Sequence, residues 1–481
     1  NNGTTPAGLA AITVNGGDST TGDRVIVNGT TGTDTVSATA ATADSIDLTG
    51  VQGVATLDLN TVENVAYNGL GGDDVFTFNG TAADNAITHT SGVAADAGAF
   101  AIDSLLGLSY QNLGTGATIN VDGQGGTNTF VMQGGDGDEN LRLGDLGAGG
   151  LAVDLRTGLD PFVPTVDHVN VNLTANIAAV TLDGRSGSDR FSVAPDVGLP
   201  VSVLGSGSDD TLFIDGSGAS VGRLTAVVGL LLEVGPSFNI PGEKNGFIVQ
   251  NATGTSIEYQ GVEAVQIDGG GIADSVQVAD DGADNVWSIG AGEPVGLGAP
   301  STRVAIDNRA PISIGSVGTL TFLNNSDSVD RFVVSPFALP SATFNIAGAA
   351  AGTATGATRD TLEVRGTGAD NNFSVTSTTV VDQTGGPALN YTDIATIVVD
   401  GLGGNDTFQV DGTAAIAPAI HVVGGSGFDL LQVTGTADNA TYTPGPGNSE
   451  GQLLYTTGGN TQMSITFTGL EPVQDNVTAT N

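Results

Sequence analysis

Short alternating runs broken by glycine and aspartate are the feature that most constrains the fold of this chain. Apolar and polar residues alternate in runs such as 24–27, 75–78 and 407–410, and this period of two is typical of β-strands with one buried face. Gly, Asp, Asn and Thr soon interrupt each run, which would break helices repeatedly. The sequence therefore predicts an all-β fold made of short strands.

Internal repeats organise these strands. The repeated unit is an alternating run that ends in Asp-Gly or Asn-Gly, a glycine-rich turn, and an acid that opens a second alternating run. The clearest copies lie at 67–76, 261–278 and 397–408, and shorter turns containing Asp-Asn lie at 80–85, 281–285, 366–371 and 435–439. We interpret the unit as strand, turn, strand, in which the Asp either hydrogen-bonds to turn amides or ligates a cation.

The spacing of the turn acids bears on the architecture. Asp189 and Asp210 are 21 residues apart, and Asp406 and Asp429 are 23 apart, which is close to one coil of a parallel β-helix. Wider spacings elsewhere suit either several coils or a β-sandwich with the motif in one hairpin. We therefore expect repeated short-strand units, arranged as a β-solenoid or β-helix-like stack or as tandem β-sandwiches.

The pattern divides the chain into segments. Residues 1–20 lack a full motif, and we expect an N-terminal arm there that could donate a strand to a neighbour's sheet. Residues 21–300 and 301–481 form two β-repeat regions, with a soft boundary where prolines cluster at 295–312 and an insertion near 221–250. The longest apolar run, 224–234, is about half the length of roughly 20 residues that crosses a bilayer, so we expect no membrane insertion.

The charge of the chain excludes several partners. Its 481 residues include 52 acidic but only 12 basic residues, for a net charge of −40. Without a basic stripe the chain cannot neutralise phosphate, which excludes nucleic acid and anionic membrane surfaces as partners. Multivalent cations are compatible with this charge. The absence of cysteine excludes disulfides, thiolate metal sites and cysteine nucleophiles.

The segments 69–76 and 401–408 resemble the haemolysin-type (RTX-like) glycine/aspartate repeats of large secreted bacterial surface proteins, whose pattern is Gly-Gly-x-Gly-x-Asp-x-apolar-x. The resemblance implies secretion, an extracellular or cell-surface location, a β-roll or β-solenoid and calcium binding. Here the motifs are isolated rather than in tandem, and one copy has Asn128 in place of Asp. A continuous calcium roll is therefore not expected.

Acids on the glycine turns are the candidate calcium ligands, because calcium takes six to eight oxygens from carboxylates and backbone carbonyls on loops. The alternative for each is an Asp that hydrogen-bonds to its own turn. The candidates are Asp73, Asp74, Asp136, Asp138, Asp209, Asp210 and Asp406.

Nothing in the sequence indicates catalysis. The three histidines, His89, His168 and His421, are far apart, and no zinc-protease, nucleophile-elbow or P-loop motif is present. Paired acids could serve a polysaccharide-active β-helix enzyme, but such pairs are expected by chance in so acidic a chain. We therefore predict that the protein is not an enzyme.

Asn-x-Ser/Thr sequons make a glycosylated surface a further hypothesis. The candidates are Asn28, Asn79, Asn172, Asn251, Asn324, Asn390, Asn405 and Asn439.

Two functions remain. The first is a structural protomer of an extracellular self-assembling filament or surface layer, stabilised by calcium and partnered by copies of itself. The second is an adhesin segment that binds glycans or another cell surface. Carbohydrate sites commonly use aromatic platforms, and the chain has only one Trp and six Tyr, so the structural role is favoured.

Overall fold

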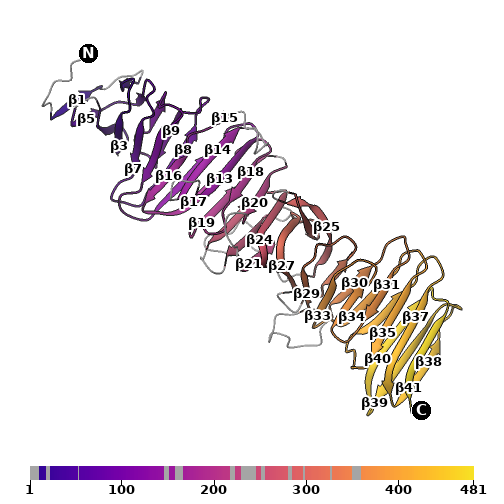
Figure 1. Cartoon of the computed structure of the whole chain (residues 1–481). Helices are drawn as coiled ribbons and strands as arrows, with labels where there is room; N and C mark the ends of the chain where they lie inside the picture. The colour runs from indigo at the N-terminus through magenta and orange to yellow at the C-terminus, as the bar shows by residue number, and fades with distance from the viewer. Residues whose placement is uncertain are drawn as a thin grey trace. The chain divides into compact units, whose positions relative to one another are not determined.

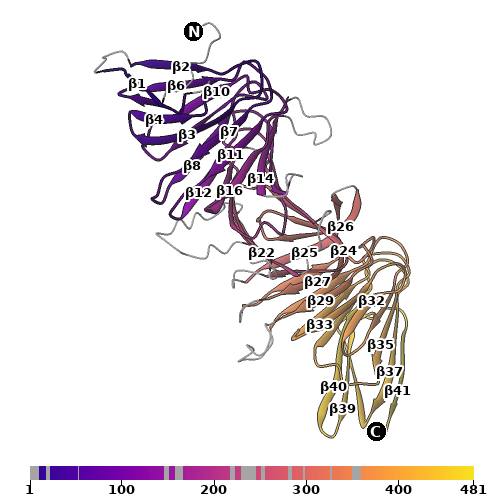
Figure 2. The same cartoon turned by 60° about the vertical axis from the view of Figure 1, so that its left-hand side comes forward.

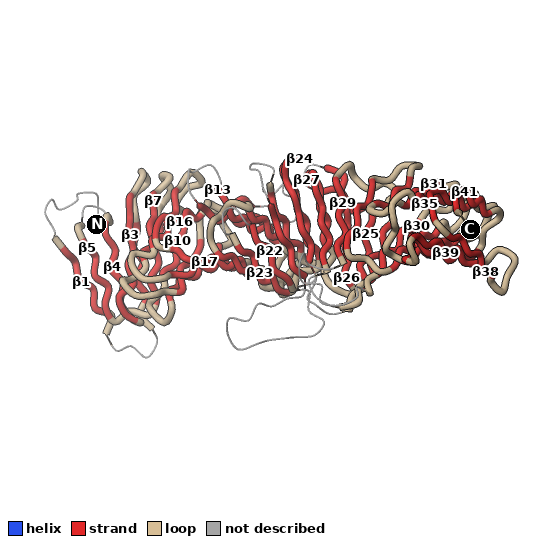
Figure 3. Tube along the Cα trace, turned by 90° about the horizontal axis from the view of Figure 1, so that it is seen from below, coloured by secondary structure: helices blue, strands red, loops and turns tan. Residues whose placement is uncertain are grey.

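The computed structural model describes residues 10–17, 22–51, 54–145, 151–157, 166–207, 209–216, 223–228, 245–250, 255–279, 284–295, 298–324, 328–348 and 359–480. Every secondary-structure element within these ranges is a β-strand (Figure 3). The predicted all-β fold is therefore confirmed. The described residues contain no helix that is long and apolar enough to span a bilayer.

The chain forms two compact units. The first comprises residues 1–214 and 253–263, and the second comprises residues 215–252 and 264–481. The boundary predicted at 295–312 lies inside the second unit, in strand β26 and the start of β27.

The strands of the first unit are β1 (Ala11–Asn15), β2 (Arg24–Asn28), β3 (Thr35–Thr42), β4 (Ser45–Thr49), β5 (Thr56–Asn60), β6 (Asn64–Asn68), β7 (Val75–Asn79), β8 (Ala86–Ser91), β9 (Gly98–Ile102), β10 (Leu108–Gln111), β11 (Thr118–Asp122), β12 (Asn128–Gln133), β13 (Glu139–Asp145), β14 (Leu151–Thr157), β15 (Val166–Asp167), β16 (Val171–Ala175), β17 (Ile177–Asp183), β18 (Arg190–Val193), β19 (Pro200–Leu204), β20 (Thr211–Asp215) and β23 (Ser256–Gln260).

The strands of the second unit are β21 (Arg223–Val228), β22 (Gly246–Gln250), β24 (Ala264–Ala279), β25 (Val286–Val295), β26 (Ala299–Ile306), β27 (Ile312–Leu323), β28 (Arg331–Val334), β29 (Thr343–Ala347), β30 (Thr361–Arg365), β31 (Asn372–Val375), β32 (Thr379–Asp382), β33 (Ala388–Thr392), β34 (Thr396–Asp400), β35 (Thr407–Gly412), β36 (Ala419–Val423), β37 (Leu430–Ala437), β38 (Asn439–Pro444), β39 (Gly451–Thr457), β40 (Asn460–Thr468) and β41 (Val473–Ala479).

Successive coils stack their strands in parallel, and we call each stack of equivalent strands a column. In the first unit one column is β2, β6 and β10, the next is β3, β7, β11 and β16, and a third is β8, β12, β17, β19 and β23. Figures 1 and 2 show these strands side by side. Columns of parallel strands are the pattern of a β-solenoid, and the predicted solenoid-like stack of short-strand units is confirmed.

The second unit repeats this arrangement. One column is β25, β28, β30, β34, β36 and β40, and its neighbour is β31, β35, β37 and β41. New columns open through antiparallel strands: β32 pairs with both β31 and β33, and β9 does the same between β8 and β10 in the first unit. This antiparallel strand returns the chain to the older column.

Alternation along each strand separates the core from the surface. In β7, Phe76 and Phe78 are fully buried while the intervening Thr77 lies on the outer face. Rings fill the core of the first unit, where the Phe78 and Phe100 centroids are 4.7 Å apart. In the second unit, Trp287 packs against Phe332 with centroids 5.1 Å apart. Burial of these apolar faces supplies the main stabilising force.

Two predicted segments differ from expectation. Within the expected arm, Ala11–Asn15 is strand β1 and pairs in parallel with β5 of its own chain, because Ile12 and Val14 continue the apolar face of Leu57 and Leu59. Residues 1–9 and 18–20 lie outside the described residues. Within the expected insertion, β21 and β22 form an antiparallel pair and β21 also pairs with β24, so this part belongs to the sheet.

Candidate functional site: the stacked glycine corners

Most of the predicted glycine turns form the corners between neighbouring columns. The copy at 261–278 does not, because 264–279 is one continuous strand, β24, whose register with β27 shifts at the glycines. Each corner joins two strands, as residues 401–406 join β34 to β35. A glycine opens the corner, and an acid or amide five residues later, here named the inner residue, closes it. These pairs are Gly29 with Asp34, Gly69 with Asp74, Gly80 with Asn85, Gly123 with Asn128, Gly134 with Glu139, Gly184 with Asp189, Gly205 with Asp210, Gly366 with Asn371, Gly401 with Asp406, and Gly424 with Asp429.

Inner residues connect one coil to the next. Asp406 Oδ1 accepts a hydrogen bond from the backbone N–H of Asn371 in the preceding coil, at 2.7 Å, and Asp429 Oδ1 accepts one from Asp406 N–H at 2.8 Å. A buried backbone N–H needs an acceptor, and at a corner the sheet ladder cannot supply one. The same bond in the first unit joins Asp34 to Asp74, Asn85 to Asn128, Glu139 to Asp189, and Asp189 to Asp210, naming the N–H donor first.

The residue directly before the inner residue bonds in the opposite direction along the stack. Asp370 Oδ1 accepts the N–H of Asn405 in the following coil at 2.7 Å, and Asn405 Oδ1 accepts that of Phe428 at 2.9 Å. Equivalent first-unit bonds are Gly116 N–H to Asp73, Thr127 N–H to Asp84, and Ser188 N–H to Asp138. The pairs 73–74 and 405–406 therefore accept backbone N–H groups from both adjacent coils, and we call such inter-coil hydrogen bonds staples. In the Asp-Asn pairs 84–85 and 370–371 the aspartate bonds to the following coil, while the asparagine Oδ1 accepts an N–H of its own corner.

The opening glycine is required by space. A Cβ added to Gly401 would lie 2.2 Å from Asp406 Oδ2 and 2.7 Å from the carbonyl oxygen of Gly424. At Gly69 it would lie 2.2 Å from Asp74 Oδ2. The inner carboxyl group thus occupies the volume of the missing side chain, which explains why glycine and acid recur together at this spacing.

The calcium candidates are distributed over these two opposing positions. Asp73 is exposed and Asp74 is fully buried, and they bond to the following and preceding coils respectively. Asp138 accepts Ser188 N–H, and Asp406 accepts Asn371 N–H.

The remaining candidates lie nearby on the same corners. Asp136 accepts the Ser186 hydroxyl at 3.3 Å, the exposed Asp209 has a φ of 63°, and the buried Asp210 accepts Asp189 N–H. In the described ranges no three His, Asp or Glu side chains gather closely enough to hold a metal ion. These residues do not converge into the six-to-eight-oxygen shell that calcium takes, and calcium at the turns stays a prediction from the sequence.

Burial changes the pKa of some of the inner acids. Loss of solvent, with further contributions from Asp429, Asp370 and Asp382, raises the pKa of Asp406 to about 6 despite the hydrogen bond from Asn371. Burial also raises the pKa of Asp74 and of Asp189. Buried carboxyl groups without a nearby cation favour the protonated form.

The histidines do not form a single site. His89 is buried in β8, with Nε2 2.7 Å from Tyr110 Oη and Nδ1 3.1 Å from Met132 Sδ. Burial, with a contribution from His168, lowers its pKa to about 3, so it is neutral at physiological pH. His421 lies on β36 in the second unit, 2.8 Å from the Thr466 hydroxyl.

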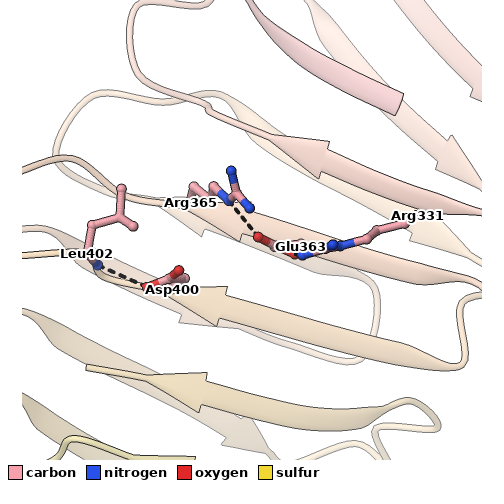
Figure 4. Close-up of polar contacts among 5 residues, drawn as sticks. All are labelled: Arg331, Glu363, Arg365, Asp400 and Leu402. Atoms are coloured by element: carbon pink, nitrogen blue, oxygen red, sulfur yellow. Dashed lines mark hydrogen bonds and ion pairs between the residues drawn. The ribbon is translucent and has the colours of Figure 1, made fainter. Parts of the chain in front are cut away.

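A feature that sequence reasoning missed is an acid held between two arginines in each unit. Glu363 is buried and accepts Arg331 Nε at 2.8 Å and Arg365 Nε at 2.5 Å (Figure 4). Burial alone would raise the pKa of Glu363, but the hydrogen bonds and charges of the two arginines leave this pKa lowered. In the first unit Asp154 pairs likewise with Arg142 and Arg156. The acid-x-Arg spacing, which places both residues on one strand face, was the available signal.

The sequon asparagines divide by environment. Asn79 donates to the Ser37 hydroxyl, while Asn172 and Asn390 donate to the stacked amides of Asn120 and Asn345. Asn324 is fully buried and donates to Asp360, so the folded chain has no room for a glycan there. Asn28, Asn405 and Asn439 lie on β2, a corner and β38, and Asn251 lies outside the described residues.

Comparison with known proteins adds no assignment: no protein-family model and no curated protein sequence matches this chain.

Proposed function

We propose that the chain is a structural protomer of an extracellular or cell-surface assembly, a filament or surface layer in which copies of the chain are joined to one another. The observation that carries the proposal is the generic nature of the coil-to-coil contact. Within each unit, backbone ladders and staples of the same kind recur between successive described coils, so a coil of one copy presents the groups that a coil of another copy can bind.

The edge strands are the place where such a contact would form. Among the described residues, β1 pairs only with β5 and β41 only with β37. Each therefore offers one edge of backbone N–H and C=O groups, the arrangement that accepts an added strand. Assembly must overcome repulsion between copies of net charge −40, so it should strengthen with ionic strength as the Debye length falls to about 8 Å near 0.15 M salt.

A pair of substitutions in β1 tests the proposal. Ile12→Lys places a charge on the apolar face of the edge strand, which Ile12 shares with Leu57 of β5 although it is itself exposed, and this charge blocks strand addition. Thr13→Lys adds the same charge to the opposite face. Sedimentation velocity should show large polymers for the wild type and Thr13→Lys and a shift to monomers for Ile12→Lys. Equal polymerisation by both variants would contradict assembly through this edge.

Calcium and glycans belong to the same proposal and have their own tests. Loss of polymers in chelator, with recovery in millimolar calcium, would make calcium the joint. A chain that stays monomeric in every condition and retains a carbohydrate or cell-surface ligand would support the adhesin function instead. An intact mass of 47.6 kDa, that of the bare chain, would refute covalent glycosylation.

A further inference from the structure

One corner shows what the inner position requires. Asn128 is fully buried, and its Oδ1 accepts the N–H of Asn85 in the preceding coil, as the Oδ1 atoms of Asp74, Asp406 and Asp429 accept an N–H from theirs. Its Nδ2 donates to three backbone carbonyl oxygens, those of Gly123 at 2.9 Å, Gly125 at 2.8 Å and Asn176 at 2.8 Å. The second polar atom of the Asn128 side chain therefore faces backbone carbonyl oxygens, which accept hydrogen bonds. A donor at this position satisfies them.

Other corners supply a donor to the second oxygen of the acid. Asp330 Oδ2 accepts the indole N–H of Trp287 at 2.9 Å, and Asp360 Oδ2 accepts the amide of Asn324 at 3.0 Å. In the Gly-Thr corners the residue after the glycine does so, as Thr30 N–H donates to Asp34 Oδ2.

Four inner aspartates have no such donor. Asp74, Asp189, Asp406 and Asp429 are at most 1% exposed, and the Oδ2 of each has no hydrogen-bond partner. In the Asp406 corner Leu402, at a φ of 66°, turns its N–H to Asp400 (Figure 4).

The nearest acceptors match those around Asn128. A Cβ built on Gly69 would touch Asp74 Oδ2 and the Asn112 carbonyl oxygen at 2.2 and 2.5 Å; built on Gly123, it would touch Asn128 Nδ2 and the Asn176 carbonyl oxygen at 2.4 and 2.6 Å. The carboxyl oxygen therefore stands where the amide donor stands in the Asn corner, against the equivalent carbonyl.

We propose that the folded chain holds Asp74 and Asp406 as neutral carboxylic acids in mildly acidic solution, with the Oδ2 hydroxyl donating to a backbone carbonyl of the next coil. Each of these two acids is then a proton-carrying staple rather than a cation ligand, and the stack tightens as the pH falls. This does not depend on self-assembly.

The neighbouring charges also favour the protonated form of these carboxyl groups. The charged or titratable groups that act on Asp406 are all acids: Asp370 from the preceding coil, Asp382 from β32 and Asp429 from the following coil. Asp34, Asp73 and Tyr67 stand around Asp74. Burial raises the pKa of Asp74, and that of Asp406 to about 6. None of these neighbours offers a positive charge that would hold the carboxylate form.

The test compares Asp406→Asn with Asp400→Asn, which removes the same charge from an acid in the same corner that already accepts Leu402 N–H. Urea unfolding is followed by Trp287, the only tryptophan, which is buried in the second unit. The proton's stabilisation is complete below the unfolded pKa, about 3.9, and is lost as the pH rises through the folded value. The folding equilibrium constant of Asp406→Asn, divided by that of the wild type, should therefore rise from about 1 at pH 4 to about 10 or more at pH 7.

Two outcomes would overturn the proposal: destabilisation by Asp406→Asn at pH 7, or a stabilisation of the wild type by calcium that this variant loses, as a metal ligand requires. Infrared spectroscopy supplies a second readout that needs no unfolding. The C=O stretch of a neutral carboxylic acid should be present in the wild type at pH 5.5, weaker in Asp406→Asn and unchanged in Asp400→Asn. An equal band in all three chains would also refute the proposal.

Discussion

Replacing the opening glycine of one corner by alanine tests the physical reason for the repeat. At Gly401 the new Cβ would lie 2.2 Å from Asp406 Oδ2 and 2.7 Å from the Gly424 carbonyl, whereas ordinary contact begins at 3.4 Å. The carboxyl group would have to move by about 1.2 Å (3.4 − 2.2), away from a position fixed by Asn371 N–H. Overpacking costs about 1–3 kcal/mol and a lost buried hydrogen bond about 1 kcal/mol, so Gly401→Ala should lower the free energy of unfolding by about 2–4 kcal/mol.

Gly368→Ala is the matched control. It lies in the neighbouring corner of the same unit, its added Cβ meets nothing within 4 Å, and its φ is not positive. Alanine there should be neutral or stabilise by about 0.4–1 kcal/mol, because it restricts the unfolded chain. Urea unfolding monitored by Trp287 fluorescence measures both variants in the second unit. Equal effects of the two substitutions would refute the steric explanation of the glycine–acid pair.

Three further predictions concern other staples and charges. Asp370→Ala should lower the unfolding free energy of the second unit by about 1 kcal/mol, since Asn405 N–H loses its acceptor; unchanged hydrogen exchange at Asn405 would contradict it. Because the pKa of Glu363 is lowered in the folded state, its stabilisation is present above the unfolded value and is lost as the pH falls below about 4.3. Glu363→Gln should flatten this loss in Trp287-monitored unfolding, and an unaltered pH profile would show that the arginine pairs contribute nothing. His89, whose pKa is lowered to about 3, should destabilise the first unit as the pH falls from about 6.5; His89→Phe should remove this dependence in hydrogen exchange of β8, and its persistence would count against a neutral buried imidazole.

Much of the fold followed from local pattern. The alternation at 75–78 predicted a strand with one buried face, and in β7 Phe76 and Phe78 are buried while Thr77 is not. The Asp-Gly and Asp-Asn signals correctly marked corners at 80–85, 366–371 and 401–406, because these residues satisfy turn amides where a chain leaves a sheet. They were wrong at 269–271, which lies inside β24, and at 435–439, where β37 runs to Ala437 and β38 begins at Asn439. Pattern could not decide between a stack and tandem sandwiches, since strand partners are set by contacts between coils that are distant in sequence.

The candidate site shows where local reasoning ends. Adjacent acids such as Asp73 and Asp74 suggested a shared cation. Both lie in the corner before β7, where Asp73 has a φ of 56°, and their side chains bond to different coils. The buried indole of Trp287 against Asp330, and Asn324 against Asp360, bring together residues 43 and 36 positions apart. No pattern in the sequence around these residues predicts either contact. The fold of Ala11–Asn15 onto β5 was missed for the same reason.

Electron microscopy of the purified wild-type chain, at 0.15 M salt with calcium and then with chelator, tests the structural role most directly. The account predicts regular fibres or sheets in which strands of neighbouring copies continue the parallel columns. Dispersed monomers in both conditions would contradict it.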